Sequence, residues 1–360
     1  MTARLSVGLV SAAHVHADTY ADLLRSMPDV ELIGLADPDA RRGNDFANLH
    51  SFPFLGELPA LLALHPDAVV VTSENANHRR DVEAAAAAGA HVLCEKPLAT
   101  TVQDARAIVE SCARADVRLM TAFPMRFSPA MGRVAAAVAA NEIGRVRAVS
   151  AVNQGQIPTR HRAWFGDREL AGGGAVADHT VHVLDLLRWL LGAEPTEVWA
   201  TANHILHADR TEVETGAVVA VTFDDGTIAT IDCSWSRPDN YPTWGGLSME
   251  IVGERGVLDV DAFRQRFAVF DAREPGASWT YWGSDADRAM IRAFLGAVRD
   301  GAEPPVTGLD GLRAVEVVQA AYRSLDLGEP VRVGAVDPSD KRLGRTQVRP
   351  NAATARGSSV

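Results

Sequence analysis

Asp178 and His182 are the first pair of residues whose types and spacing could do chemistry. Residues four apart share one face of a helix, and Asp185 lies near the same face. A carboxylate beside an imidazole raises the basicity of the ring and fixes its orientation, which suits a base that takes a proton from an alcohol. The alternative is a helix whose first-turn Asp interacts with the helix dipole, beside an incidental histidine. We predict no metal site, because no convincing further pair of ligands accompanies these two.

A second candidate is the charged pair Glu95 and Lys96, which follows the apolar run "HVLC" and precedes Pro97. Such a pair lies at the carboxyl edge of a parallel sheet, where open α/β sheets bind their ligands. The alternative is a solvated pair before a turn.

The stretch "SAAHVH", residues 11–16, stands where a phosphate-binding loop would follow the apolar run "LSVGLV". The three glycines of a G-x-G-x-x-G fingerprint permit a tight turn, close approach to pyrophosphate and close helix packing. Here those positions fall on Ser11, Ala13 and His16, so the alternative is an ordinary strand-to-helix turn. We predict that His14 or His16 faces a cofactor crevice and supplies a side-chain donor there.

Asp37 strengthens the cofactor interpretation, because it ends the second apolar run, "LIGLAD". An acidic residue at about this spacing accepts hydrogen bonds from the adenosine ribose hydroxyls and favours NAD over NADP. Arg41 and Arg42 lie just beyond it and soften this preference, so NADP stays open. The alternative for Asp37 is a helix cap or turn residue in "DPDA".

These candidates must be positioned by the elements around them, and the first third of the chain alternates strand and helix signals. Expected strands are "RLSVGLV", "VELIGLAD", "DAVVVTS", "HVLCEKP" and "RLMTAF", and expected helices are "ADTYADLLRSMP", Arg79–Ala88 and "TVQDARAIVESCARAD". This order predicts a parallel sheet with helices on both faces.

After about residue 123 the pattern changes to long alternating segments with hairpin turns, which predicts an α+β region with antiparallel sheet. Expected strands are Val146–Val152, Glu197–His204, Gly216–Phe223, Thr227–Trp235, Leu247–Val252 and Val257–Val260. Expected helices are Pro129–Ala140, His179–Leu191, Ala286–Arg299 and Gly308–Ser324. We predict three parts: residues 1–123, residues 124–336 and a polar tail, residues 337–360.

Composition limits the classes of function. A formal charge of −11 argues against nucleic-acid binding, which needs clustered Lys and Arg. Three widely spaced cysteines form no disulfide framework or zinc signature, so a reducing cytoplasm is the simplest setting. No apolar run approaches the length of a membrane span, and no signal peptide is expected at the N-terminus.

Together these motifs resemble the Gfo/Idh/MocA family of NAD(P)-dependent oxidoreductases, over about residues 4–333. The resemblance is carried by "VLCEKPLA" (92–99), "GGGAVADHTVHVLDLLRWLLG" (172–192), "AFPMRFSPAM" (122–131) and "VTSENANH" (71–78). It implies an N-terminal Rossmann domain with a doubly wound parallel sheet. A C-terminal α+β domain with a large open, mainly antiparallel sheet would follow, and this sheet would join the chains of a homodimer or homotetramer.

The resemblance also implies roles for the motif residues. His182 would accept the hydroxyl proton while hydride passes to C4 of the nicotinamide, Asp178 would orient this system, and Lys96 would hold the oxygen. The implied cofactor contacts are Ser11, Ala13, His14, His16, Asp37, Thr72, Ser73, His78, Glu95 and Lys96. Three features depart from the family: the phosphate loop lacks its glycines, Thr180 stands where D-x-G-x-H has glycine, and Ser73 stands where proline is usual.

Polar and aromatic residues near the expected cleft suit a polyhydroxylated substrate, with hydroxyls hydrogen-bonded and a C–H face on an aromatic ring. The candidates are Arg126, Arg160, His161, Trp164 and Tyr241, with Asn153, Gln154 and Trp244 nearby. We therefore predict a dehydrogenase that acts on a secondary alcohol of a sugar, cyclitol or sugar derivative. The alternatives are a non-catalytic sensor on the same fold, or a net non-redox enzyme with recycled NAD.

Overall fold

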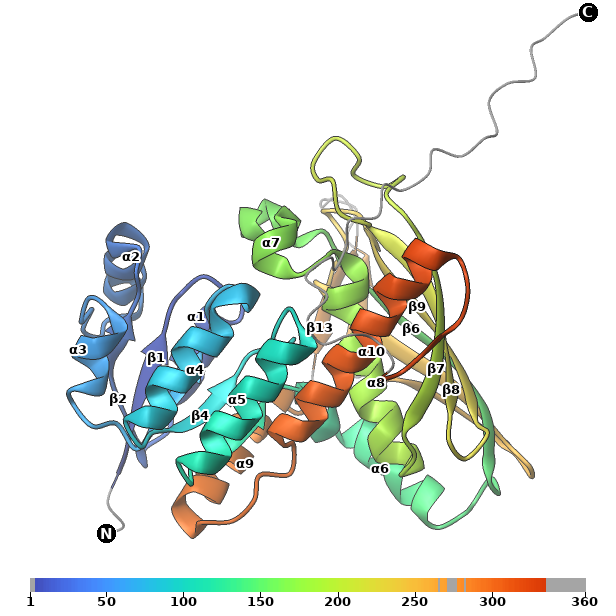
Figure 1. The fold of residues 1–360 in the computed structure, drawn as a ribbon, viewed down its shortest axis with the longest axis horizontal. Coiled ribbons are helices and arrows are strands. Elements are labelled where there is room, and N and C mark those ends of the chain that lie inside the picture. The colour runs from blue at the N-terminus through green and yellow to red at the C-terminus, as the bar shows by residue number, and fades with distance from the viewer. Residues whose placement is uncertain (1–3, 265, 271–276, 282, 335–360) are drawn as a thin grey trace, which may run out of the picture.

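The N-terminal third forms a five-stranded parallel sheet with strand order β2-β1-β3-β4-β5 (Figure 1). The computed structural model describes residues 4–264, 266–270, 277–281 and 283–334. The strands of this sheet are β1 Leu5–Val10, β2 Val30–Ala36, β3 Ala68–Val71, β4 His91–Cys94 and β5 Leu119–Thr121. All pairings are parallel, so the five carboxyl ends share one edge, and the order reverses between β1 and β3. The predicted parallel sheet is confirmed.

Helices cover both faces of this sheet because its strands are apolar on both sides. Successive residues of β3 belong to different cores: Val70 lies in the core that includes Tyr20 and Leu24 of α1, whereas Val71 lies in the core that includes Val82 of α4. The helices of the chain are α1 Ala17–Arg25, α2 Ala40–His50, α3 Leu58–Leu62, α4 His78–Ala87, α5 Val102–Arg114, α6 Pro129–Ala139, α7 Arg168–Ala171, α8 Ala175–Leu191, α9 Ala286–Asp300 and α10 Gly308–Leu327. Short 3-10 turns are η1 Asn75–Asn77, η2 Pro124–Phe127, η3 Pro158–Arg160 and η4 Ala163–Gly166.

Helices α2 and α3 were not predicted. The sequence of α2, "ARRGNDFANLH", buries little apolar surface, so hydrophobic periodicity does not reveal it. It begins instead on a cap, because the Asp39 carboxylate accepts hydrogen bonds from the amides of Arg41 and Arg42.

The second sheet has seven strands in the order β11-β10-β6-β9-β8-β7-β14, and only the β6–β9 pairing is parallel among these described strands. Its strands are β6 Val146–Gln156, β7 Pro195–Asn203, β8 Gly216–Phe223, β9 Ile228–Arg237, β10 Gly245–Gly253, β11 Val257–Asp261 and β14 Val331–Arg332. The fold class predicted for this half is confirmed, although β6 runs to Gln156 rather than to Val152.

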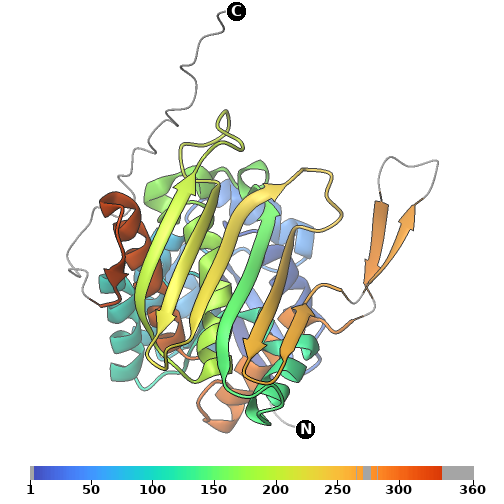
Figure 2. The ribbon, with the colours of Figure 1, turned by 90° about the vertical axis from the view of Figure 1, so that its right-hand side faces the viewer.

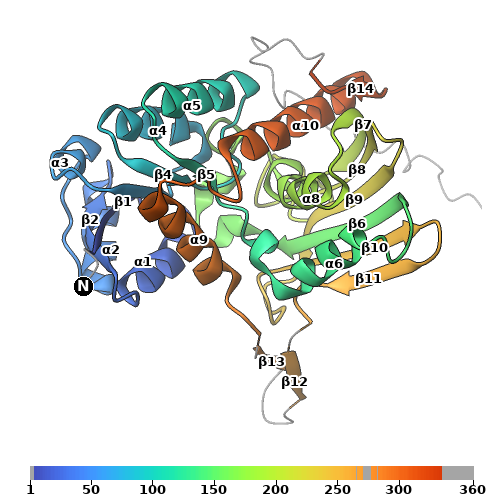
Figure 3. The ribbon, with the colours of Figure 1, turned by 90° about the horizontal axis from the view of Figure 1, so that it is seen from below.

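Helix α8 lies across the inner face of the seven-stranded sheet, and α10 packs on β7, α8 and α5 (Figure 3). Figure 2 shows the opposite face of the sheet, which no helix covers among the described residues. Buried residues of both sheets join in one continuous apolar core, which runs from Leu9 through Phe123 and Leu184 to Ile231. This core fixes α8 against the carboxyl edge of the parallel sheet.

A separate hairpin, β12 Arg266–Phe270 and β13 Ala277–Tyr281, projects from the body and was not predicted (Figures 2 and 3). The division after residue 123 stays a prediction, and the proposed tail, residues 337–360, lies outside the described residues. Within the described part of the chain, no helix combines the length and apolarity needed to cross a bilayer. All three cysteines, Cys94, Cys112 and Cys233, are buried and free.

Candidate active site

The turn after β1 follows the sharp path of a dinucleotide loop, although it contains no glycine. Ser11 has φ +67°, a left-handed conformation that costs a residue with a side chain about 1 kcal/mol. Its hydroxyl donates to Asp37 Oδ2 at 3.2 Å and accepts the amide of Ala13 at 3.2 Å, which offsets part of that cost. Ser11 thus occupies the first glycine position and makes the tight turn.

The side chain of Asp37 holds this loop through hydrogen bonds to Ser11 and Ala12. It is 1% exposed and accepts the Ala12 amide, the Asp39 amide and two guanidinium nitrogens of Arg42, each at 2.8–2.9 Å. Arg42 also reaches Glu74 at 3.1 Å, and its guanidinium is 27% exposed. The predicted ribose-binding carboxylate is therefore already paired with a cation at the outer edge of the sheet.

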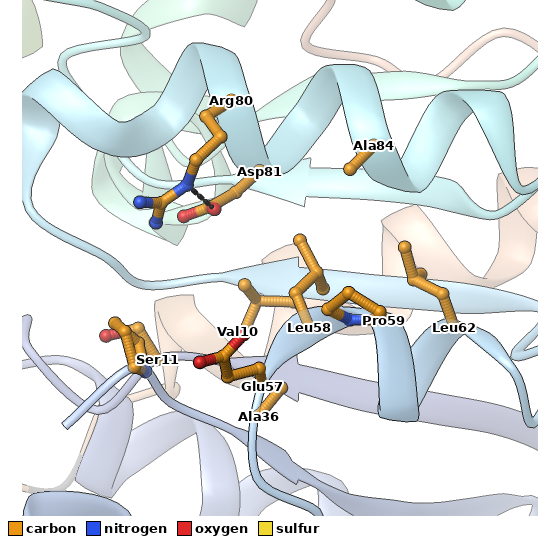
Figure 4. Close-up of a pocket in the computed structure, with 11 residues that line it drawn as sticks. Val10, Ser11, Ala36, Glu57, Leu58, Pro59, Leu62, Arg80, Asp81 and Ala84 are labelled. Carbon is orange, nitrogen blue, oxygen red and sulfur yellow. Dashed lines mark hydrogen bonds and ion pairs between the residues drawn. The ribbon is translucent and has the colours of Figure 1, made fainter. Parts of the chain in front are cut away.

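A pocket of about 610 Å³ opens beside this turn (Figure 4). Its lining combines apolar side chains with one ion pair: Val10, Ser11, Ala36, Pro38, Glu57, Leu58, Pro59, Leu62, Arg80, Asp81 and Ala84. Neither Lys96 nor Asp178 lines it, so this cavity lies away from the candidate catalytic groups. It lies between the ends of β1 and β2 and the helices α3 and α4.

The two histidines of the loop turn toward Glu95 at the end of β4. His16 Nδ1 lies 2.8 Å from Glu95 Oε1, and His14 Nδ1 lies 3.8 Å from the same oxygen. Burial alone would raise the pKa of Glu95, but the two imidazoles and Lys96 outweigh it and hold that pKa well below its usual range. Desolvation lowers the pKa of His14, whereas Glu95 and Asp287 raise that of His16 despite its desolvation.

Lys96 and Asp178 form the central ion pair. Lys96 Nζ lies 2.7 Å from Asp178 Oδ1, and the two side chains are 5% and 13% exposed. Asp178 Oδ2 accepts the indole N–H of Trp235 at 3.0 Å and lies 3.3 Å from His179 Nε2. Although burial opposes ionisation, Lys96 and His179 keep the pKa of Asp178 far below its ordinary value, so the carboxylate stays charged.

His182 lies one turn along α8 from this pair, with its ring 6.1 Å from that of Phe123. Its Nδ1 is buried and has no hydrogen-bond partner. Asp178 does raise the pKa of His182, as expected, but this effect is outweighed. Desolvation and the Lys96 ammonium lower the pKa of His182 well below its ordinary value, and the opposing effect of Asp178 is smaller.

The glycine run before α8 places its first turn. Gly173 has φ +150°, and a Cβ there would lie 1.8 Å from Tyr322 Oη, while one on Gly174 would lie 2.0 Å from the Glu214 carbonyl oxygen. The buried Glu214 carboxylate accepts the Gly174 amide at 2.8 Å and the Tyr322 hydroxyl at 2.7 Å. Only glycines permit this close approach to Tyr322 and Glu214. The approach fixes the position of the N-terminal turn of α8, which carries Asp178.

The end of β3 lies beside the loop. Thr72 Oγ1 donates to the Ser11 carbonyl at 2.6 Å, and its own carbonyl accepts the His14 amide at 2.9 Å. Ser73 Oγ is buried without a partner. His78 contacts the Pro97 carbonyl through Nδ1 at 3.0 Å and the Ser73 carbonyl through Nε2 at 3.2 Å. Its imidazole therefore ties the end of β3 to the turn after Lys96.

The predicted substrate residues do not form one cluster. The guanidinium of Arg126 is 9% exposed and contacts Asp185 at 2.6 Å and Asp310 at 3.2 Å. Burial and Asp310 raise the pKa of Asp185 to about 7 despite the guanidinium. These three residues form an ion-pair group about two turns along α8 from Asp178.

The remaining substrate candidates lie on the segments after β6 and β9. Arg160 contacts the Asp239 carbonyl at 3.4 Å, and the His161 ring meets that of Trp244 at 5.3 Å. Trp164 is buried and donates its indole N–H to the Ala13 carbonyl at 2.9 Å. The Arg237 guanidinium lies 4.0 Å from the centre of the Tyr241 ring.

Sequence reasoning missed the partners that hold Asp178. Trp235 is fully buried on β9, and nothing in the sequence near Asp178 points to it. The Asn153 amide oxygen accepts from His179 Nδ1, 2.8 Å away. Gly155 leaves room for that ring, since a Cβ would lie 2.9 Å from His179 Cε1. The ion pair between Arg42 and Asp37 was also missed. The five-residue spacing would have suggested it only if a helix over residues 40–50 had been predicted.

Comparisons with known proteins agree with this architecture. Residues 5–123 match the oxidoreductase family model with an NAD-binding Rossmann fold, and residues 131–259 match the GFO/IDH/MocA C-terminal domain. A myo-inositol 2-dehydrogenase of Thermotoga maritima is 27% identical, over 92% of this chain and 98% of its own length. A 1,5-anhydro-D-fructose reductase of Ensifer adhaerens is 28% identical, over 91% and 98% respectively.

A solved structure is also similar across the whole fold. GenD2 from gentamicin A biosynthesis, in complex with NAD, has a TM-score of 0.84 and 28% identity, covering 93% of this chain and 98% of that one. Together, the two family matches span more than half of the chain and both of its sheets. The chain belongs to the GFO/IDH/MocA family, and it is an NAD(P)-dependent oxidoreductase that acts on CH–OH groups.

Proposed function

We propose that this enzyme transfers hydride between NAD and a secondary alcohol or ketone of a sugar, cyclitol or sugar derivative. The observation that carries the proposal is the 2.7 Å Lys96–Asp178 ion pair, with His182 one helical turn away. Relatives named for such substrates support the class, among them a D-apiose dehydrogenase and a scyllo-inositol 2-dehydrogenase.

The residues beside the turn fit a bound dinucleotide. Ser73 Oγ is buried and unpartnered at the end of β3, where a polar ligand group would satisfy it. The pocket beside Ser11 accommodates an adenosine, and Arg42 stands where a 2′-phosphate would be recognised, so NADP remains a second cofactor candidate. The other proposed contacts are Ala13, His14, His16, Asp37, Thr72, His78, Glu95 and Lys96.

When bound, the nicotinamide accepts or returns the hydride. His182 takes the hydroxyl proton as hydride leaves the carbon, and its lowered pKa keeps the ring neutral and ready at neutral pH. Lys96 stabilises the negative charge that develops on the oxygen. Asp178 is a positioning residue, because it fixes the ammonium, and Trp235 and His179 fix Asp178 in turn.

The proposed substrate set is smaller than the sequence suggested. Arg160 and His161 remain in it, because their side chains lie on the exposed segment after β6. Arg126 is left out because two carboxylates occupy its guanidinium, and Trp164 acts on the loop through Ala13. Tyr241 stays as an aromatic wall candidate beside Arg237. We also propose a homodimer or homotetramer formed through the uncovered face of the seven-stranded sheet, and a cytoplasmic setting.

The test is a spectrophotometric screen for NADH or NADPH across cyclitols, aldoses and sugar acids, with NAD and NADP in parallel. We expect net reduced cofactor with at least one of these classes, and its loss in Lys96→Met. Turnover of substrate without net NADH would favour the recycled-cofactor alternative. Absence of NAD and NADP binding by calorimetry would overturn the proposal.

A further inference from the structure

His14, His16 and Glu95, which are also among the proposed cofactor contacts, form a three-residue cluster that takes no part in the proposed proton and hydride transfer. Each offers one ligand atom, and the three atoms lie within 4.8 Å of one another. In the part of the chain that the structure describes, no other group of three His, Cys, Asp or Glu residues has this arrangement. We propose that this cluster binds a divalent transition-metal ion, with Zn²⁺ as the best match to its donors, and so pins the cofactor loop to β4.

The distances suit a shared ion. Ligand atoms at ~2.0 Å from a tetrahedral zinc are roughly 3.3 Å apart. Glu95 Oε1 lies 2.8 Å from His16 Nδ1 and 3.8 Å from His14 Nδ1, so the two observed distances fall on either side of that value. The two rings stand 4.6 Å apart at 66°, and both turn toward the same carboxylate oxygen. Small rotations of the side chains therefore complete the set.

The donor types match a borderline-soft cation. Two imidazoles and one carboxylate are a known catalytic zinc set, in which the fourth position stays open for water or another ligand. Glu95 is fully buried and His14 is 1% exposed, so bulk water does not compete strongly at these atoms. The His16 side chain is 28% exposed and leaves a path for the ion to enter.

The charges around the cluster also favour a cation. Lys96 follows Glu95 in sequence, but its ammonium is paired with Asp178 at 2.7 Å, so these two charges largely cancel. Despite desolvation, Glu95 and Asp287 raise the pKa of His16. The phenol of Tyr20, whose ring centroid lies 5.8 Å from that of His16, is uncharged. The buried Glu95 carboxylate therefore supplies negative charge at the centre of the cluster, which favours a bound cation.

A bound ion would have to displace the hydrogen bonds that His14 Nδ1 and His16 Nδ1 now make. His14 Nδ1 accepts the His16 amide at 3.1 Å, so this nitrogen carries a lone pair and no proton. Because the Glu95 carboxylate only accepts, His16 Nδ1 donates to it across 2.8 Å. Coordination therefore gives up the amide contact at His14 and expels or relocates the His16 proton, which predicts measurable proton release.

The experiment titrates the full chain, stripped with a chelator and exchanged into metal-free buffer, with Zn²⁺ by calorimetry and by competition with a chromophoric chelator. We expect one Zn²⁺ per chain, with proton release that differs between buffers of different ionisation enthalpy. His14→Asn, His16→Asn and Glu95→Gln should each weaken binding on the order of 100-fold. The matched control is His65→Asn, because His65 is exposed, lies outside the cluster and has φ +51°, which Asn tolerates.

Two further measurements keep the result independent of folding and of catalysis. Circular dichroism and the melting temperature identify a variant that fails to fold, and Zn²⁺ should raise the melting temperature of the wild type and of His65→Asn alone. Co²⁺ bound in place of Zn²⁺ should give visible d–d bands of a low-coordinate site, which His16→Asn removes. Because these readouts need no substrate, a failed hydride-transfer assay leaves them unaffected. Binding that is absent, or equally tight in all four variants, would overturn the proposal and leave a proton-sharing cluster.

Discussion

The two sides of the candidate site treat their polar groups differently. On the loop side, which comprises Ser11–His16, Asp37 and Glu95, most polar groups satisfy one another. Asp37 accepts two amides and a guanidinium, whereas His14 Nε2 is buried without a partner. On the helix side, which comprises Lys96, Asp178 and His182, His182 Nδ1 has no partner. Paired groups such as Asp37 hold the conformation of the loop, whereas an imidazole with an unpartnered nitrogen, such as His182, can still exchange a proton. Changes on the helix side should therefore alter turnover, and changes on the loop side should alter cofactor affinity.

The largest effect should come from Lys96→Met, which removes the ammonium and leaves the Asp178 carboxylate without its cation. We expect kcat/KM to fall by about 10³-fold, the size of losing a preorganised charge. The measurement is steady-state kinetics on the substrate found by the screen, with NAD affinity measured separately. Lys96→Arg, which keeps the charge, should recover part of the rate. If only NAD affinity fell, Lys96 would act in cofactor binding, and the expected division between the loop side and the helix side would be wrong.

His182→Gln should lower kcat by about 10²-fold or more, because it removes the proposed general base and puts a side chain of similar size in its place. Its matched control is His65→Asn, an exposed histidine far from α8, which should retain wild-type kcat. Unchanged kcat in His182→Gln would show that another group takes the proton.

Arg42→Ala tests the loop side, since Arg42 pairs with the buried Asp37 and reaches Ser11 Oγ. We expect the dissociation constant of NADP to rise by roughly 10-fold, the loss of one charge-assisted contact, and that of NAD to rise less. Fluorescence or calorimetric titration of each cofactor gives both values. Equal weakening of the two, or a drop in kcat instead, would contradict the role given to this arginine.

The smallest change is expected from pH around neutrality. His182 must be neutral to accept a proton, and its pKa lies well below the ordinary 6.5, so protonation begins only in more acidic solution. The acid limb of kcat/KM should therefore lie below pH 6.5, with a nearly flat profile above it. An acid limb at or above that value would mean that a different base, or a solvated His182, controls the rate.

Sequence patterns predicted the fold better than the contacts within the site. Strand alternation and helix periodicity sufficed for the parallel sheet, but α2 stayed hidden because its start depends on the Asp39 cap. Lys96 and Asp178 were each predicted, yet their ion pair joins residues 82 positions apart, and no local pattern encodes that contact.

The net lowering of the His182 pKa has the same origin. Spacing placed a carboxylate next to the ring, but the pKa depends on desolvation and on Lys96, which reaches the helix from another sheet. The His14–His16–Glu95 cluster likewise joins a loop to a residue 79 positions away from His16. The protonation states and ligand sets of such groups depend on tertiary contacts, which sequence patterns do not encode.

The hydrogen bond from Trp164 to the Ala13 carbonyl has a thermodynamic consequence. Trp164 follows Arg160 and His161 on one short segment, so the residues proposed to meet substrate are tied to the turn proposed to meet pyrophosphate. Binding of substrate at the first place and of cofactor at the second should then be linked by one coupling free energy. By reciprocity, the factor by which cofactor tightens substrate binding equals the factor by which substrate tightens cofactor binding. Trp164→Phe, which keeps an aromatic ring and removes the indole donor, should bring that factor toward one.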